Sequence, residues 1–320
     1  MNSRQRALNW PYPRRRRFQK ELQDAATRWF ADKGFPADKR YPYILDRWDN
    51  WPKNIILPEV SDLIKKVRDE RDPTDAFPLH RYIHHGLSSQ AMLFNLIGPM
   101  MVSQDYSPLK VALGNEGIKY PTGNVEAQFE VEDRQVFAED SGQPTSLDLA
   151  LRGDDPADAL YIECKLSEAK FGGCSVFADA DCDGRNPSRQ LDSCYLHHIG
   201  RLYWSLLEKH GFLDTPVGTD SSCVLVNHYQ FFREFLFAVE KGGRFVLLCD
   251  ERNPAFYCKH ETNPRRTRGL MEYLQTLIPQ HLQSKIAHVT IQQVMSSLRQ
   301  VGGHDHWMDE FERKYGLTSF

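Results

Sequence analysis

Residues 144–168 have the sequence PTSLDLALRGDDPADALYIECKLSE, and this stretch decides the fold. Polar and apolar residues alternate within 146–152 and again within 159–166, which is the pattern of β-strands with two different faces. The run 153–158 (GDDPAD) between them is rich in turn-forming residues and predicts a turn. We therefore expect an antiparallel hairpin, in which the two strands lie side by side.

The hairpin is predicted to gather charged side chains on one face. In the first strand Asp148 is expected on one face, and Leu147, Leu149 and Leu151 on the other. In the second strand Glu163 and Lys165 share a face, and strand pairing would bring them close to Asp148. Two carboxylates and an ammonium group suit a hard divalent cation such as Mg²⁺, which prefers oxygen ligands, water and phosphate. The alternative is an exposed sheet face held together by salt bridges.

The flanking segments complete an α/β pattern. Ser88 and Ser89 precede an apolar stretch and predict the start of a helix over 88–102. Alternation over 125–137 predicts a strand that comes before the hairpin and forms an antiparallel meander with it. The later elements are expected to be a helix over 188–209, a strand over 222–227, a helix over 229–240 and a strand over 244–250. The fold class is therefore α/β or α+β, with a mixed central sheet flanked by helices.

The rest of the chain is expected to add to this core. Helical spacing predicts further helices over 18–33, 59–70, 265–283 and 304–314, and a strand over 287–292. We expect three parts: a basic arm and helical cap over 1–87, the core over 88–250, and an α/β extension packed on the core over 251–320.

The Asp-x14-Glu-x-Lys spacing of Asp148, Glu163 and Lys165 resembles the active site of the PD-(D/E)XK nuclease superfamily, which is restriction-endonuclease-like. The core of that superfamily has the element order αβββαβ, and the order expected over 88–250 is similar to it. The resemblance implies hydrolysis of DNA phosphodiester bonds with Mg²⁺, for which Mn²⁺ can substitute. It also implies that Asp148, Glu163 and the backbone carbonyl of Cys164 bind the metal, and that Lys165 orients the attacking water.

Short stretches are also similar to restriction-endonuclease-like proteins of bacteria. These stretches are Ser88–Ala91, Gly142–Asp148, Ile162–Glu168 with the following Phe171 and Gly172, and Tyr229–Arg233.

Many members of the superfamily add a carboxylate or an amide from the first core helix. In this chain the matching candidate is Gln90, with a polar group near a helix cap as the alternative. Glu126 and Glu130 on the preceding strand are possible accessory ligands, and a solvated strand edge is the alternative for both. Because no helix-borne glutamate is present at this position, the sequence leaves the number of metal ions open.

The basic residues are concentrated at one end of the chain. The net charge of the whole chain is −3, yet its first twenty residues hold seven basic residues and no acidic one. Arg14, Arg15, Arg16 and Arg17 are candidates for binding nucleic-acid phosphates, because cationic side chains gain affinity by displacing counterions. The alternative for them is a flexible, solubilising terminus. Arg233 is predicted either to bind a phosphate or to pair with an acid.

Seven cysteines are an odd number in a long chain and favour reduced thiols in the cytoplasm. Cys174, Cys182 and Cys194 lie near each other in the sequence, but their spacings are longer than those of zinc fingers, so we do not expect a structural zinc. Cys223 and Cys249 are interpreted as strand-core thiols. No apolar run is long enough for a membrane span, and no secretory signal is expected.

The sequence lacks the motifs of several other enzyme classes. It contains no Gly-x-Ser-x-Gly elbow, no phosphate-binding Gly-x-x-x-x-Gly-Lys-Ser/Thr loop and no His-Glu-x-x-His. The predicted function is a DNA endonuclease of restriction, phage defence or repair, with a homodimer or a defence-system protein as partner. The alternatives are an inactive or partner-dependent nuclease fold that binds nucleic acid, and a zinc-stabilised interaction protein. RNA is not distinguished from DNA.

Overall fold

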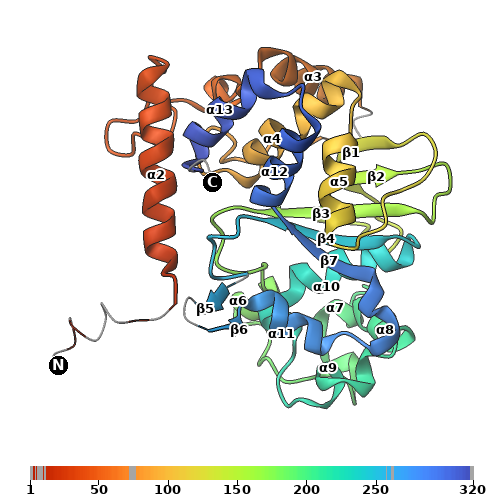
Figure 1. Cartoon of the computed structure of the whole chain (residues 1–320). Coiled ribbons are helices and arrows are strands. Elements are labelled where there is room, and N and C mark those ends of the chain that lie inside the picture. The colour runs from red at the N-terminus through yellow and green to blue at the C-terminus, as the bar shows by residue number, and fades with distance from the viewer. Residues whose placement is uncertain are drawn as a thin grey trace.

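A mixed β-sheet lies at the centre of the molecule (Figure 1). The structure is a computed structural model that describes residues 12–71, 77–256, 258–260 and 263–317, together with residues 3, 5 and 10; for 258–260 and 263–268 it describes the backbone alone. Within these residues the sheet has five strands in the order β1-β2-β3-β4-β7. Strands β1 to β3 are antiparallel to each other, and β4 and β7 continue parallel to β3. The strands are β1 (Glu126–Glu132), β2 (Ser146–Arg152), β3 (Ala159–Lys165), β4 (Arg244–Cys249) and β7 (Ile286–Thr290).

The predicted fold class is confirmed, because helices cover both faces of this mixed sheet. The meander of the first three strands is also confirmed, and β2 and β3 pair from Leu149–Ile162 to Arg152–Ala159. The division of the chain into three parts stays a prediction.

One face of the sheet is covered by the helix that follows Ser88. The Ser88 hydroxyl accepts the Ala91 N–H at 3.2 Å, which satisfies a free donor of the first turn and fixes the start of α4. Helix α4 is buried along most of its length and packs with its neighbours on Leu149, Leu151 and Ile162. The helices of this layer are α3 (Pro58–Glu70), α4 (Ser89–Ser103), α5 (Ser107–Asn115), α12 (Ile291–Val301) and α13 (Asp305–Tyr315), with the 3₁₀ turn η1 (Trp48–Asn54) beside them.

The opposite face is covered by a phenylalanine-rich helix. Helix α10 buries Phe231 and Phe235 against Phe245 of β4, with ring centroids 5.7 and 6.4 Å apart. Burial of such rings is a main source of stability because aromatic side chains remove large apolar areas from water. The elements of this layer are α6 (Ser175–Ala178), η2 (Leu191–Ser193), α7 (Tyr195–His198), α8 (Tyr203–Lys209), η3 (Phe212–Asp214), α9 (Pro216–Thr219), α10 (Leu225–Glu240), α11 (Leu270–Leu277) and η4 (Gln280–Lys285). A separate pair of strands, β5 (Cys258–His260) and β6 (Asn263–Arg268), lies beside it.

The long helix α2 (Arg15–Asp32) stands at one side of the sheet and packs along α13 (Figure 1). Lys33 pairs with Glu310, and the fully buried Lys314 lies 4.4 Å from the centre of the Trp29 ring. Segments that lie near opposite ends of the described chain are therefore in contact.

Three expectations about the middle of the chain are wrong. Residues 222–227 form no strand; their apolar run leads directly into α10, and the strand that pairs with β3 is β4. Residues 188–209 form short helical pieces instead of one helix. The segment 265–283 begins as strand β6 and becomes helical only at α11.

The two faces of β2 also differ from the expectation. Leu147 packs in the core cluster of α10 together with Val131 of β1, whereas Leu149 and Leu151 pack in the other cluster. The change of face occurs where Glu130 has a φ of 52°, a left-handed conformation that interrupts regular strand geometry. The register therefore skips Glu130 and Asp148, the two acidic residues at this point.

Candidate active site

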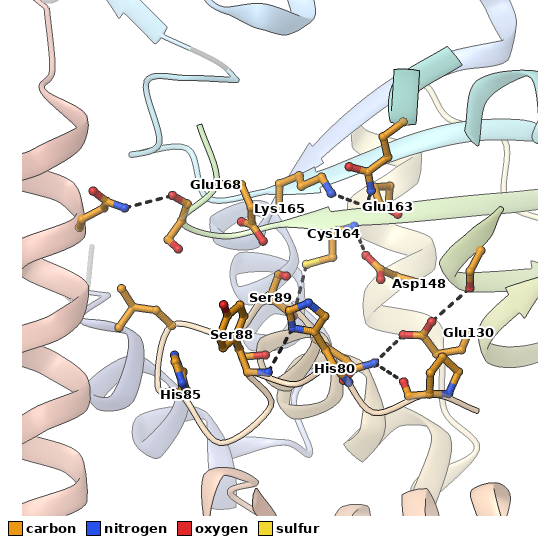
Figure 2. A pocket seen from close by; sticks show the side chains of 18 of the residues that line it. His80, His85, Ser88, Ser89, Glu130, Asp148, Glu163, Cys164, Lys165 and Glu168 are labelled. Atoms are coloured by element: carbon orange, nitrogen blue, oxygen red, sulfur yellow. Dashed lines mark hydrogen bonds and ion pairs between the residues drawn. The ribbon is translucent and has the colours of Figure 1, made fainter. Parts of the chain in front are cut away.

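Strands β2 and β3 separate at the residues that follow their last pair, Leu149 and Ile162. Beyond that pair, β2 continues only along β1, and β3 continues only along β4. The Cys164 N–H, which has no backbone partner on β2, donates to Asp148 Oδ2 at 2.7 Å (Figure 2). This arrangement is a fork between two strands, with a carboxylate in its opening.

Glu163 and Lys165 lie at the same fork. Lys165 Nζ donates to Glu163 Oε1 at 2.5 Å, and both side chains are almost fully buried. Gln230 of α10 donates to the same oxygen at 3.0 Å. The structure thus brings together Asp148, Glu163 and Lys165, the three residues on which the sequence interpretation depends, as Figure 2 shows.

Gln90 and Glu130 form a second polar pair beside the fork. Gln90 Nε2 donates to Glu130 Oε1 at 2.6 Å and to the Pro78 carbonyl at 3.0 Å. Gln90 Oε1 accepts the His80 N–H at 2.9 Å, and Ser146 donates to Glu130 Oε2 at 3.2 Å. Gln90 therefore holds Glu130 in position from the first turn of α4.

These residues line a pocket of about 760 Å³. Its far wall is helix α2, where Arg15 Nη2 donates to the Ser167 carbonyl at 2.7 Å. Residues that precede α4, including His80 and His85, close another side (Figure 2). The pocket is thus assembled from α2, the segment before α4, the fork and α10.

Burial raises the pKa values of the pocket carboxyl groups. The pKa of Glu163 is raised to about 8 by burial and then by the neighbouring charge of Glu234. The pKa of Glu130 is raised to about 8 by burial and then by the charge of Asp148. Burial, followed by the charge of Glu163, raises the pKa of Asp148 well above its usual range. In each case burial is the largest cause and a neighbouring carboxyl group adds to it, so ionising these groups in the pocket costs free energy.

Lys165 does not neutralise all of this charge. Burial alone would lower the pKa of Lys165, but the carboxylates around it, first Glu163 and then Glu234, raise it instead. Lys165 therefore stays protonated. One lysine faces several buried carboxyl groups, so a bound cation would relieve their repulsion.

Glu234 lines a neighbouring pocket, which shares Ser146 and Gln230 with the first, and the sequence interpretation missed it. Burial raises its pKa to about 8, and its Oε2 atom is buried without a hydrogen-bond partner in the described residues. Gln230 and Glu234 are one helical turn apart on α10. The signal was present in the sequence, because a glutamate interrupts the apolar face of a phenylalanine-rich helix.

The backbone of Cys164 also faces the fork. The N–H and C=O groups of one strand residue point to the same edge, so the carbonyl of Cys164 is directed to the side on which its N–H meets Asp148. The Cys164 thiol instead points to the α4 side, where Sγ lies 3.7 Å from the Ser89 carbonyl. Only the backbone of this residue is therefore available as a metal ligand in the fork.

Other predicted site residues lie elsewhere. Glu126 is exposed at the start of β1, opposite Arg152, and does not line the pocket. Arg233 pairs with Glu139 at 2.7 Å and is mostly buried, which is the acid-pairing alternative.

The basic arm forms the beginning of α2. Arg14 precedes the first turn, and Arg15 lines the pocket. Arg14, Arg16 and Arg17 are exposed beside it. The earlier residues Arg4 and Arg6 lie outside the described residues.

In the part of the chain that the structure describes, no three His, Cys, Asp or Glu side chains are grouped to hold an ion. Mg²⁺ does not require such a group, because it keeps several waters and is bound by one or two carboxylates and substrate phosphate. Among the described residues, no helix combines the length and apolar character needed to cross a bilayer.

Comparison with known proteins identifies one family. The model of the family described as "Restriction Endonuclease associating with ARP" matches residues 23–316. Searches of curated proteins and of solved structures return no match. The family match spans α3 to α13, the whole central sheet and most of α2.

Proposed function

Because the chain belongs to the family of restriction endonucleases associating with ARP, we propose that it is a Mg²⁺-dependent endonuclease that hydrolyses phosphodiester bonds in DNA. The family supports a nuclease-like function. The PD-(D/E)XK assignment, the metal and the roles of individual residues are part of the proposal.

The observation that carries the proposal is the composition of the fork. Asp148, Glu163 and Lys165 come from two adjacent strands and meet in one pocket, with Cys164 offering its backbone carbonyl. A sheet interior would not be stabilised by such a cluster, since each buried charge costs free energy unless it is compensated. Their convergence in an open pocket is better explained by a bound cation and a charged substrate.

The donor set fits Mg²⁺. Asp148, Glu163 and the Cys164 carbonyl are hard oxygen donors. Burial raises the pKa values of both carboxyl groups, and a bound cation would offset the cost of ionising them. When bound there, Mg²⁺ would polarise the phosphate and lower the pKa of a coordinated water. Glu130 and Glu234 lie close enough to affect these carboxylates electrostatically and are candidates for outer ligands.

Lys165 would act on the water and on the phosphate. It stays protonated beside Glu163, so it can hold the attacking water by hydrogen bonding and offset charge that develops on the phosphate oxygens. Gln230 shares the Glu163 oxygen and fixes the direction of that carboxylate.

Arg14 to Arg17 would hold the nucleic-acid backbone. Arg15 lines the pocket and is bonded to the loop after β3, and Arg14, Arg16 and Arg17 are exposed beside it. Phosphate contacts of this kind position the substrate without reading its sequence.

The test is cleavage of supercoiled and linear DNA by the full-length chain, with Mg²⁺ or Mn²⁺ and with a chelator as the metal-free control. We expect cleavage only with metal, and loss of about three orders of magnitude in rate for Asp148→Asn and Glu163→Gln. Glu208→Gln is the matched control, because Glu208 is exposed on α8, away from the fork. Equal cleavage by the wild type and both fork variants would show that the fork is not catalytic.

The second candidate is a nuclease fold that requires a partner or that binds nucleic acid without cutting. The family description, which names association with ARP, favours a partner. Calorimetric titration with Mg²⁺ alone separates the candidates: binding that Glu163→Gln abolishes supports the nuclease, and absence of binding supports the non-cutting protein. Single-stranded RNA as a parallel substrate decides between DNA and RNA.

A further inference from the structure

Four cysteines on the α10 side of the sheet line one small cavity. They are Cys174, Cys182, Cys194 and Cys223, and apolar side chains form its other walls. All four thiols are free. Cys223, which the sequence places apart from the others, therefore joins them in space.

Backbone N–H groups favour the thiolate form of three of the four cysteines. Burial raises the pKa values of the Cys174 and Cys223 thiols, and the N–H groups of the second and third residues after each cysteine act against that rise. The sulfur of Cys182 accepts the Gly184 N–H at 3.4 Å. Hydrogen bonds of this kind stabilise negative charge on sulfur, and the thiolate is the form that binds metals.

The segment that carries three of these cysteines has almost no core of its own. Within 172–200 the buried residues are Cys174 and Pro187, and the helical pieces α6, η2 and α7 are three or four residues long. A long irregular segment with so little apolar burial gains little stability from packing. A metal centre would supply the missing constraint, because metal binding contributes directly to folding.

We propose that Cys174, Cys182, Cys194 and Cys223 together hold a thiolate-bound metal centre. Four thiolates are the donor set of structural zinc and also of iron–sulfur clusters. The centre fixes the irregular segment to the start of α10, the helix that carries Gln230 to the pocket.

The placement of the thiols restricts the kind of centre. No three of these thiols, in the described part of the chain, are placed around a single ion position. One zinc ion would have to draw the sulfurs inward, whereas the cysteines of an iron–sulfur cluster bind different irons and stand further apart. Phe177 and Tyr195 at the cavity are exposed, so the metal can enter from solvent.

The test is metal analysis of the full-length chain, purified without oxygen and without chelators. We expect about one zinc per chain, or about four irons with equal acid-labile sulfide and visible absorption. X-ray absorption at the metal edge is expected to show sulfur ligands. A folded protein that holds neither metal and takes up neither on reconstitution overturns the proposal, and so does a metal without sulfur ligands.

Alanine variants locate the centre. Cys182→Ala and Cys194→Ala are expected to lower the metal content severalfold, whereas Cys249→Ala, which removes a buried thiol outside the cavity, retains it. Equal metal contents in the three variants contradict the proposal. If a cavity variant does not fold, the proposal is decided by whether X-ray absorption shows sulfur ligands on the metal of the wild type. Asp148→Asn is expected to leave this metal in place, so the centre and the nuclease proposal can fail independently.

Discussion

Asp148 has two roles in the structure, because its carboxylate replaces a backbone acceptor for Cys164 and also lines the pocket. The same side chain holds the fork open and supplies a charge inside it. Such a residue is costly when no cation is present, since its negative charge is buried near that of Glu163. We therefore expect removal of a buried carboxylate near the fork to raise stability and lower activity.

Glu234→Gln is the direct test of this opposition. Removing a carboxyl group whose pKa is raised to about 8 should stabilise the metal-free protein at pH 8 by on the order of 1 kcal/mol and weaken Mg²⁺ binding. Thermal unfolding with a chelator and calorimetric Mg²⁺ titration measure the two effects. Glu208→Gln, the same change at an exposed residue, should alter neither the stability nor the Mg²⁺ affinity. A loss of stability in Glu234→Gln would contradict the inference that burying this carboxyl group costs free energy.

Lys165→Met should have the opposite effect on stability. It removes the cation that pairs with the buried Glu163, so the metal-free protein at pH 8 should lose about 3–5 kcal/mol, and cleavage should be abolished. Lys170→Met, which changes an exposed lysine just beyond the strand, is the matched control for both measurements. Unchanged stability in Lys165→Met would show that the ion pair between Lys165 and Glu163 does not stabilise the folded state.

At the scale of single elements, alternation and helical spacing predicted most of the fold. The meander, α4, β4 and α13 follow from residue periodicity and from caps such as Ser88. Residues 222–227 were misassigned because a short apolar run has the same composition in a buried strand and in the first turn of a buried helix. The pairing of β3 with β4 shows that residues 222–227 are not the strand next to β3.

The candidate site was predictable where it depended on two strands and unpredictable where it depended on packing. Asp148, Glu163 and Lys165 share a hairpin, so their meeting follows from local pairing. The pocket wall from α2 and the contribution of Glu234 depend on contacts across more than sixty residues of sequence, which periodicity does not encode.

The contact between α3 and α4 is a test of packing between elements. A Cβ added to Gly98 would overlap the Val60 side chain, whereas one added to Gly114 of α5 would meet no atom within 4 Å. Gly98→Ala should therefore cost about 1–3 kcal/mol by overpacking. Gly114→Ala should instead gain up to about 1 kcal/mol from helix propensity. Chemical denaturation measures both, and equal effects of the two changes would contradict close packing at Gly98.

At the scale of the whole molecule, the buried carboxyl groups make stability depend on pH. The folded-state pKa of Glu130, of Glu163 and of Glu234 is about 8, above the usual 4.5, so the folded state binds more protons than the unfolded state between these values. Stability is therefore greatest at low pH within this window and is lost as the pH rises through about 8. His80 and His85, whose pKa values burial lowers, act in the opposite sense below about pH 6.5.

The measurement is thermal unfolding of the metal-free protein between about pH 7.5 and about pH 8.5, where the histidines are mostly neutral in both the folded and the unfolded state. The melting temperature should fall across this range, and Mg²⁺ should raise it more at the upper end. Glu130→Gln and Glu234→Gln should each flatten the slope. A melting temperature that rises with pH in the chelated wild type would contradict the raised pKa values.

The contact between α2 and α13 has a consequence for synthesis. The wall of the pocket that carries Arg15 belongs to α2, and α2 is held against the fold by α13 through Lys33–Glu310 and through Lys314 on Trp29. A ribosome delivers α2 early and α13 late, and domains fold as their segments emerge. A nascent chain therefore carries the fork residues for some time without a closed pocket around them.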